Sequence, residues 1–220
     1  GTPTLYVFAL ALFSIGVGVG SLLCEKLSAR TVEIGLVPLG AIGMTGFLLD
    51  LYFARHHVPA TSGLDVAGFL AQPGSWRVVT DLTGIGLFTG FFVVPLFALI
   101  QSRTPKAELA RVIAGLNIQN ALFIVLAAVT GIVLQMDSLT VAGVTVPLPG
   151  LSIPQLYLAL GIANAVVALY IFTIVPEFLM RFLSWLLVRA LYRLRIRGVE
   201  EHVPDEGAGL IVCNHVSYMD

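Results

Sequence analysis

The stretch VIAGLNIQNALFIVLAAVTGIVLQM, residues Val112–Met136, carries no charged side chain and is long enough to form a transmembrane helix. A helix needs about 20 consecutive apolar residues to cross the hydrocarbon core of a bilayer. The whole chain has the same character, because 57% of its 220 residues are hydrophobic and only 11% are charged, whereas soluble domains carry about 25% charged residues. The mean hydropathy is +0.94. These properties predict an integral membrane protein.

Four other stretches are comparably long and apolar. The segment from Ala54 to Asp81 separates the second and third of them, and it is polar enough that we expect a solvated loop. Pro147 and Pro154 interrupt the uncharged run before the last one. We therefore expect an all-α polytopic membrane bundle in residues 1–175, with five transmembrane helices at about residues 4–23, 34–53, 82–100, 112–136 and 155–175.

The twelve Lys and Arg residues predict which side of the membrane each loop occupies. With five spans, only Arg55 and Arg77 fall on one side. The positive-inside rule makes the opposite, basic side cytoplasmic. We therefore expect the loop around Arg55 to be external and the C-terminal end to be cytoplasmic. The expected cytoplasmic set is Lys26, Arg30, Arg103, Lys106, Arg111, Arg181, Arg189, Arg193, Arg195 and Arg197.

Small residues are patterned within the predicted spans. Gly16 and Gly20, and likewise Gly86 and Gly90, fit the G-x-x-x-G spacing, which lets helix backbones approach closely. Plain helix packing is the simpler interpretation of these glycines. Helices that slide past one another during alternating access are the functional interpretation.

Two asparagines give one predicted span a polar face. Asn117 and Asn120 are three residues apart, so they lie on the same side of a helix. Because an amide in hydrocarbon needs a partner, we expect this face to point into a bundle or cavity. Hydrogen bonding between helices and contact with a substrate headgroup both remain open as its role.

The sequence gives little indication of other kinds of site. His56 and His57 are adjacent, but without further ligand residues nearby a solvated loop is the better interpretation than a metal site. Cys24 and Cys213 are far apart and are expected to be thiols outside any disulfide or metal site. No basic run with interleaved aromatic residues indicates nucleic-acid binding. We expect no metal and no bound cofactor.

The segment at residues 176–197 mixes large apolar side chains with arginines that fall on one helical side, Arg181, Arg189 and Arg193. This pattern predicts a basic amphipathic linker helix that lies in the membrane interface. A helix packed on the segment that follows it is the alternative. After a turn, the short apolar run LIVC at residues 210–213 is typical of a buried strand.

The motif NHVSYMD at residues 214–220 follows that expected strand. If a helix begins near Ser217, Asp220 can fold back on His215 and orient its imidazole. The other ring nitrogen can then remove a proton from a hydroxyl group, as in general-base catalysis. His215 and Asp220 are therefore the candidate catalytic residues. A histidine that only caps the end of a strand is the structural alternative.

The stretch FFVVPLFALIQSRTPKAELARVIAGLNIQNALFIV, residues Phe91–Val125, resembles the second half of bacterial lysophospholipid transporters of the major facilitator superfamily. That family has a similar VPL…Q…P…RVIA…N…NA pattern across its tenth and eleventh helices. The resemblance implies that the five spans are helices eight to twelve of a twelve-helix transporter, and Asn117 and Asn120 then become candidate substrate-binding residues. In GSLLCEKLSAR, Cys24 and Glu25 stand where the superfamily's loop motif has Asp and Arg.

Residues 198–220 resemble the beginning of glycerophospholipid acyltransferases of the 1-acylglycerol-phosphate type, an α/β domain whose members have N-H-x-S-x-x-D. Asn214, His215, Ser217 and Asp220 match that motif. The later motifs of that family have no counterpart here. We therefore expect the chain to be a fragment of a longer protein, with a truncated acyltransferase domain that is inactive on its own.

Together the two resemblances imply a bifunctional protein of the bacterial inner membrane. Its transporter would bring in lysophospholipid, and its acyltransferase would reacylate the free glycerol hydroxyl. The co-substrate would be an acyl thioester of an acyl carrier protein or of coenzyme A, so the expected partners are the bilayer, lysophospholipid and an acyl carrier protein, with no nucleic acid. The alternatives are a membrane-anchored acyltransferase whose spans do not transport, and a major facilitator carrier for another substrate.

Overall fold

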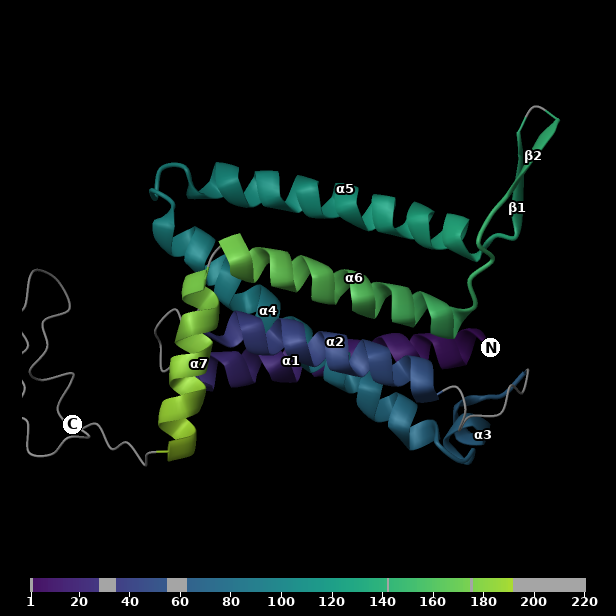
Figure 1. Cartoon of the computed structure of the whole chain (residues 1–220), viewed down its shortest axis with the longest axis horizontal. Coiled ribbons are helices and arrows are strands. Elements are labelled where there is room, and N and C mark those ends of the chain that lie inside the picture. Colours follow the sequence, from purple (N-terminus) through teal and green to yellow (C-terminus); the bar gives the residue numbers. More distant parts are fainter. Residues whose placement is uncertain (1, 28–34, 55–62, 142, 175, 192–220) are drawn as a thin grey trace, which may run out of the picture. The chain divides into compact units, whose positions relative to one another are not determined.

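The computed structural model describes residues 2–27, 35–54, 63–141, 143–174 and 176–191. Helices make up most of this part of the chain, and a single two-stranded sheet is described beside them (Figure 1). The elements are α1 (Pro3–Leu27), α2 (Leu36–Ala54), α3 (Val66–Leu70), α4 (Ser75–Arg103), α5 (Leu109–Gln135), β1 (Ser138–Val141), β2 (Val144–Pro147), α6 (Ile153–Ile174) and α7 (Pro176–Leu191).

Five of the described helices, namely α1, α2, α4, α5 and α6, are long and apolar enough to cross a membrane. The predicted bundle of apolar helices is thereby confirmed. Large hydrophobic side chains also point outward from these helices, among them Ile118, Ile124 and Tyr6. In a bilayer such side chains face lipid tails, while each helix satisfies its own backbone hydrogen bonds. The chain is a multi-pass membrane protein.

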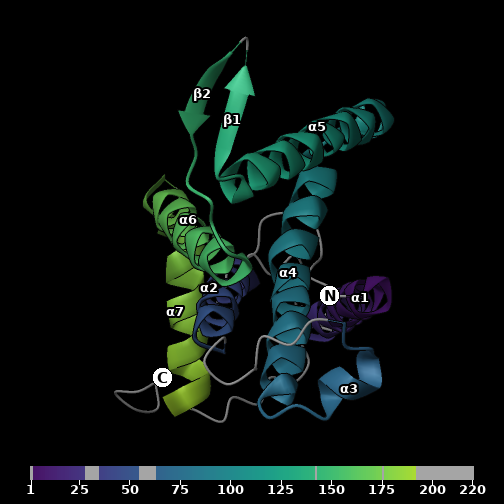
Figure 2. The same ribbon diagram turned by 90° about the vertical axis from the view of Figure 1, so that its right-hand side faces the viewer.

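Helix α4 lies at the centre of the packed group. It contacts α1 on one side and α2 on the other, and α2 in turn contacts α6. Figure 2, in which α1 and α2 are seen roughly along their axes and α4 runs down the view, shows this order from α1 through α4 and α2 to α6. Helix α5 contacts α6 but buries none of its own residues.

The contact between α1 and α4 depends on the four glycines with G-x-x-x-G spacing. All four are buried. A Cβ added to Gly16 would overlap the carbonyl oxygen of Thr83, and one added to Gly86 would overlap the carbonyl oxygen of Phe13. Gly20 and Gly90 meet the backbone of the opposite helix in the same way, at Leu87 and Ser21 respectively. The packing interpretation of these glycines is confirmed, because only a residue without a Cβ lets the two backbones come this close.

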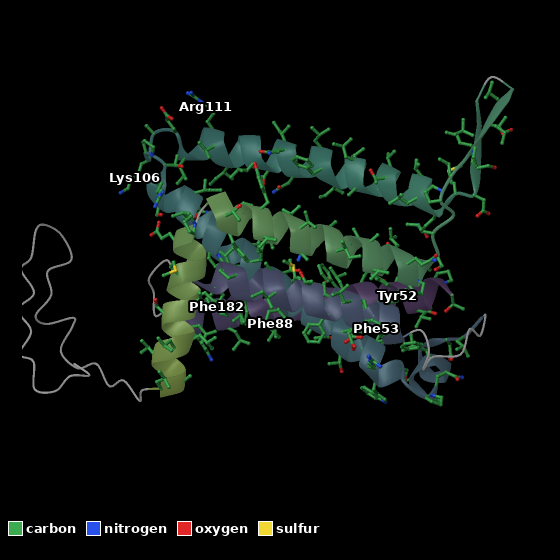
Figure 3. The ribbon with its side chains drawn as sticks, in the orientation of Figure 1. Tyr52, Phe53, Phe88, Lys106, Arg111 and Phe182 are labelled. Atoms are coloured by element: carbon green, nitrogen blue, oxygen red, sulfur yellow. The ribbon has the colours of Figure 1, made fainter. Side chains whose placement is uncertain are left out.

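Aromatic side chains fill the contact between α2 and α4. The ring centroid of Phe88 lies 5.7 Å from that of Phe47 on α2 and 5.7 Å from that of Phe91 on its own helix. Figure 3 shows Phe88 among the packed helices. Phe91 is buried with Cys24 and Leu36, so this cluster ties the three helices together.

Helix α4 begins at Ser75, whereas the uncharged run placed the start of its span near Leu82. Gly74 precedes the helix with a φ of 81°, a left-handed conformation that glycine adopts without strain. The expectation that the whole segment Ala54–Asp81 is too polar to be buried is wrong for three of its described residues, Ala54, Ser75 and Asp81. Ser75 is fully buried and donates its hydroxyl to the carbonyl of Leu70, and Asp81 is 2% exposed.

Strands β1 and β2 form an antiparallel hairpin that the sequence did not predict. Leu139 pairs with Val146 and Thr140 with Thr145. The hydroxyls of the two threonines lie 3.0 Å apart across the strands. Gly143, with a φ of 82°, lies in the turn of this hairpin. The hairpin forms most of the connection between α5 and α6.

The two ends of the bundle are distinct. Lys106 and Arg111 lie at the end where α4 turns into α5, and Tyr52 and Phe53 lie toward the opposite end (Figure 3). The hairpin, α3 and the N-terminal end of α1 lie at that opposite end (Figure 1).

The predicted linker at residues 176–197 is helical from Pro176 to Leu191, the last residue described. Glu177 occupies its first turn, a position that the helix dipole favours for an acidic side chain. Along this helix Met180, Leu183 and Leu187 are exposed.

Candidate functional site

Among the described residues, an ion pair joins α2 to α4. Asp50 lies in the last part of α2, and Arg77 lies in the first turn of α4. The Nε of Arg77 donates to Oδ2 of Asp50 at 2.8 Å, and Nη2 of Arg77 donates to Oδ1 of the same carboxylate. The side chains of Arg77 and Asp50 are 36% and 38% exposed. A two-point pair of this kind fixes orientation as well as distance.

Asp81 lies one helical turn after Arg77, so the two side chains are on the same face of α4. Asp81 as a whole residue is only 2% exposed. Within the part of the chain that the structure describes, its Oδ2 atom is buried and receives no hydrogen bond. Asp50 and Arg77 are the charged groups that act on it. A buried carboxyl oxygen without a donor is rare in folded proteins and calls for a structural or functional explanation.

A second polar contact joins α2 to α6. The side-chain amide of Asn164 donates to the carbonyl oxygen of Ala41 at 3.1 Å and to the hydroxyl oxygen of Thr45 at 2.9 Å. Thr45 donates its own proton to the same carbonyl at 2.9 Å. The three groups therefore satisfy one another inside an apolar contact. Their arrangement is typical of helix association in a membrane.

The structure places Asn117 and Asn120 on the same helix, α5, and both are exposed. Within the described ranges neither side chain makes a hydrogen bond to another residue. They are far from Asp81 in the chain and lie on a helix that buries none of its residues. Their expected roles as bundle-facing or substrate-binding residues stay predictions.

The candidate catalytic residues His215 and Asp220 lie outside the described residues, as do Asn214 and Ser217. The same holds for His56, His57 and Cys213. Cys24 is a buried thiol outside any disulfide. Over the described ranges, no three His, Cys, Asp or Glu side chains come together as a metal site would need.

Comparison of the chain with protein-family models, with curated proteins and with solved structures gives no match.

Sequence reasoning missed the groups that the structure brings together. Asp81 and Arg77 were assigned to a loop because the span was chosen for its lack of charge. The PG pair at Pro73–Gly74, a strong turn signal followed by Ser75, could have placed the helix start correctly. Asn164 had no such signal, because its partners Ala41 and Thr45 are far away in the sequence.

Proposed function

We propose that this chain is part of a bifunctional inner-membrane protein that transports lysophospholipid and reacylates it. The observation that carries the proposal is the resemblance of residues 91–125 to the second half of lysophospholipid transporters. On this proposal the apolar helices are the last five of a twelve-helix carrier, with the basic end of the bundle in the cytoplasm.

The described structure supports a carrier better than a passive anchor. An anchor needs one or two apolar helices, and this chain has five that could span. Asn117, Gln119 and Asn120 are exposed on α5, although amide groups that face lipid tails are costly. Further helices of a transporter would cover them or leave them lining a substrate path.

The proposal for the second activity depends on the NHVSYMD motif. His215 would act as the general base on the glycerol hydroxyl, and Asp220 would orient its ring and stabilise the imidazolium. Tethering the enzyme to the carrier would raise the concentration of lysophospholipid near the active site without any new contact. The acyl donor would be a thioester, either of acyl carrier protein or of coenzyme A.

The test uses the intact parent protein in liposomes, with lysophospholipid flipping and acyl transfer measured separately. His215→Ala should lower acyl transfer by about 10²–10⁴-fold, the usual contribution of a general base, and should leave flipping unchanged. Asp220→Asn should lower acyl transfer as well. His202→Ala is the matched control, because His202 lies near the motif but outside it.

The outcomes separate the alternatives. Acyl transfer without any flipping by the wild-type protein would favour a membrane-anchored acyltransferase. Flipping of another solute but not of lysophospholipid would favour a carrier of different specificity. Full acyl transfer by His215→Ala would remove the proposed role of the motif.

A further inference from the structure

The end of α2 and the start of α4 hold an uneven number of charges. Asp50 and Asp81 can each carry a negative charge, and Arg77 carries one positive charge. Both oxygens of Asp50 accept hydrogen bonds from the guanidinium of Arg77. Among the described residues, the Oδ2 atom of Asp81 receives no hydrogen bond from Arg77 or from any other donor.

The helices packed around Asp81 provide no other compensating charge among the described residues. On α1 the only ionisable side chain before Cys24 is Tyr6, which is 67% exposed. Beside α3, the carboxylate of Asp65 accepts a hydrogen bond from the backbone N–H of Gly68 and so caps that helix. On α2 the other titratable group near this end is Tyr52, and on α4 the next charged residue is Arg103, at the far end.

A carboxylate that is buried beside another carboxylate, without donors for one of its oxygens, is strongly disfavoured in its ionised form. We infer that Asp81 is a proton-binding site of the membrane bundle and that it is held as the neutral acid in the arrangement described. The neutral acid needs no compensating cation, so the ion pair between Arg77 and Asp50 can stay in place.

A proton fits this site better than a metal cation. Ca²⁺ takes six to eight oxygen ligands, and Mg²⁺ takes about six. The described residues offer Asp81 and an Asp50 carboxylate that already accepts two hydrogen bonds from a guanidinium. The positive charge of Arg77 would also repel a cation at this position.

Proton release has a structural consequence at the α2–α4 contact. An ionised Asp81 would compete with Asp50 for Arg77, because Arg77 and Asp81 lie one turn apart on one face of α4. Release would therefore weaken the pair that holds the end of α2 against α4. Coupling of this step to substrate movement rests on the proposed transport function, whereas the proton site itself does not.

Infrared spectroscopy of the full chain in lipid nanodiscs tests the site without any transport assay. The protein is prepared with ¹³C-labelled aspartate, so that the carbonyl band of a neutral aspartic acid is identified by its isotope shift. At neutral pH the wild-type protein should show such a band. Asp81→Asn should abolish it, and Asp65→Asn, which changes an exposed carboxylate, should leave it intact.

A second variant covers the case in which Asp81→Asn does not fold. In Asp50→Asn the negative charge beside Asp81 is removed and Arg77 no longer forms an ion pair with residue 50. Asp81 can then ionise beside Arg77, so the acid band should again be lost. The same spectra are recorded in sodium and in choline buffers. The inference is overturned if no neutral aspartic acid is seen, if the band survives in both variants, or if sodium ions remove it. Loss of lysophospholipid flipping with the band intact would count against the proposed transport alone.

Discussion

Asn164 connects two apolar helices through hydrogen bonds that a bilayer cannot replace. Asn164→Leu removes the bonds to Ala41 and Thr45 but leaves the bond from the Thr45 hydroxyl to the Ala41 carbonyl in place. Because no buried polar group loses its last partner, the loss should be modest. We expect the free energy of unfolding to fall by about 0.6 kcal/mol, and by no more than about 1.7 kcal/mol, the range for hydrogen bonds between membrane helices.

The measurement is denaturant unfolding of the purified protein in detergent. Asn117→Leu is the matched control, because Asn117 is also an asparagine on an apolar helix but has no hydrogen-bond partner within the described part of the chain. Its unfolding free energy should stay unchanged or increase. Equal losses in the two variants would show that the Asn164 contact contributes nothing specific.

Asp81 illustrates what could not be predicted at this scale. Absence of charge locates the hydrocarbon part of a span, but it cannot locate the helix end, where charged residues are tolerated. Whether Asp81 is solvated or buried depends on how other helices pack against α4, among them α1 and α2, which lie elsewhere in the sequence. The glycines were easier to interpret, because G-x-x-x-G spacing has a local geometric meaning.

The crossing of α1 and α4 is the element-scale feature with the sharpest prediction. In Gly16→Ala the added methyl group would overlap the Thr83 carbonyl, so the two helices must move apart. Overpacking of this kind costs about 1–3 kcal/mol. Gly86→Ala should behave alike, because its Cβ meets the carbonyl of Phe13 across the same crossing.

Gly18→Ala is the control for the crossing. Gly18 lies between Gly16 and Gly20 on the same helix, and a Cβ there meets no atom within 4 Å. Since alanine favours a helix by up to about 1 kcal/mol over glycine, this variant should be as stable as the wild type or more so. Thermal unfolding in detergent compares the wild-type protein with Gly16→Ala, Gly86→Ala and Gly18→Ala. Equal stability of Gly16→Ala and Gly18→Ala would contradict the close crossing.

Elements differed in how well the sequence predicted them. Long apolar runs, four of them uncharged and one with only Asp50 near its end, predicted the five apolar helices. Length and hydropathy are properties of each segment alone. The hairpin of β1 and β2 was missed, since only the prolines that end and follow the run SLTVAGVTVP were considered, and they were interpreted as a break between two spans. Its alternating threonines and valines, with a glycine in the turn, were the available signal.

At the scale of the whole molecule, the connection between α4 and α5 lies at one end of the bundle, and α3 and the β1–β2 hairpin lie at the other (Figure 1). Lys106 and Arg111 mark one end, and α3 lies at the other (Figures 1 and 3). The positive-inside rule then predicts that the end with Lys106 faces the cytoplasm. The structure shows which loops share an end of the bundle. Which end faces the cytoplasm has to be measured.

Cysteine labelling in intact cells provides it, in a protein with Cys24 and Cys213 replaced by alanine. A membrane-impermeant maleimide should react with Ala67→Cys from outside and should reach Lys106→Cys only after the membrane is permeabilised. Ala67 and Lys106 are both exposed, and Ala67 avoids the neighbouring Asp65, whose carboxylate caps α3. Leu51→Cys, buried between helices, should react in neither case and controls for leakage. The reverse labelling pattern would invert the proposed topology, and it would place the segment after α6 outside the cell, where no intracellular acyl thioester could reach His215.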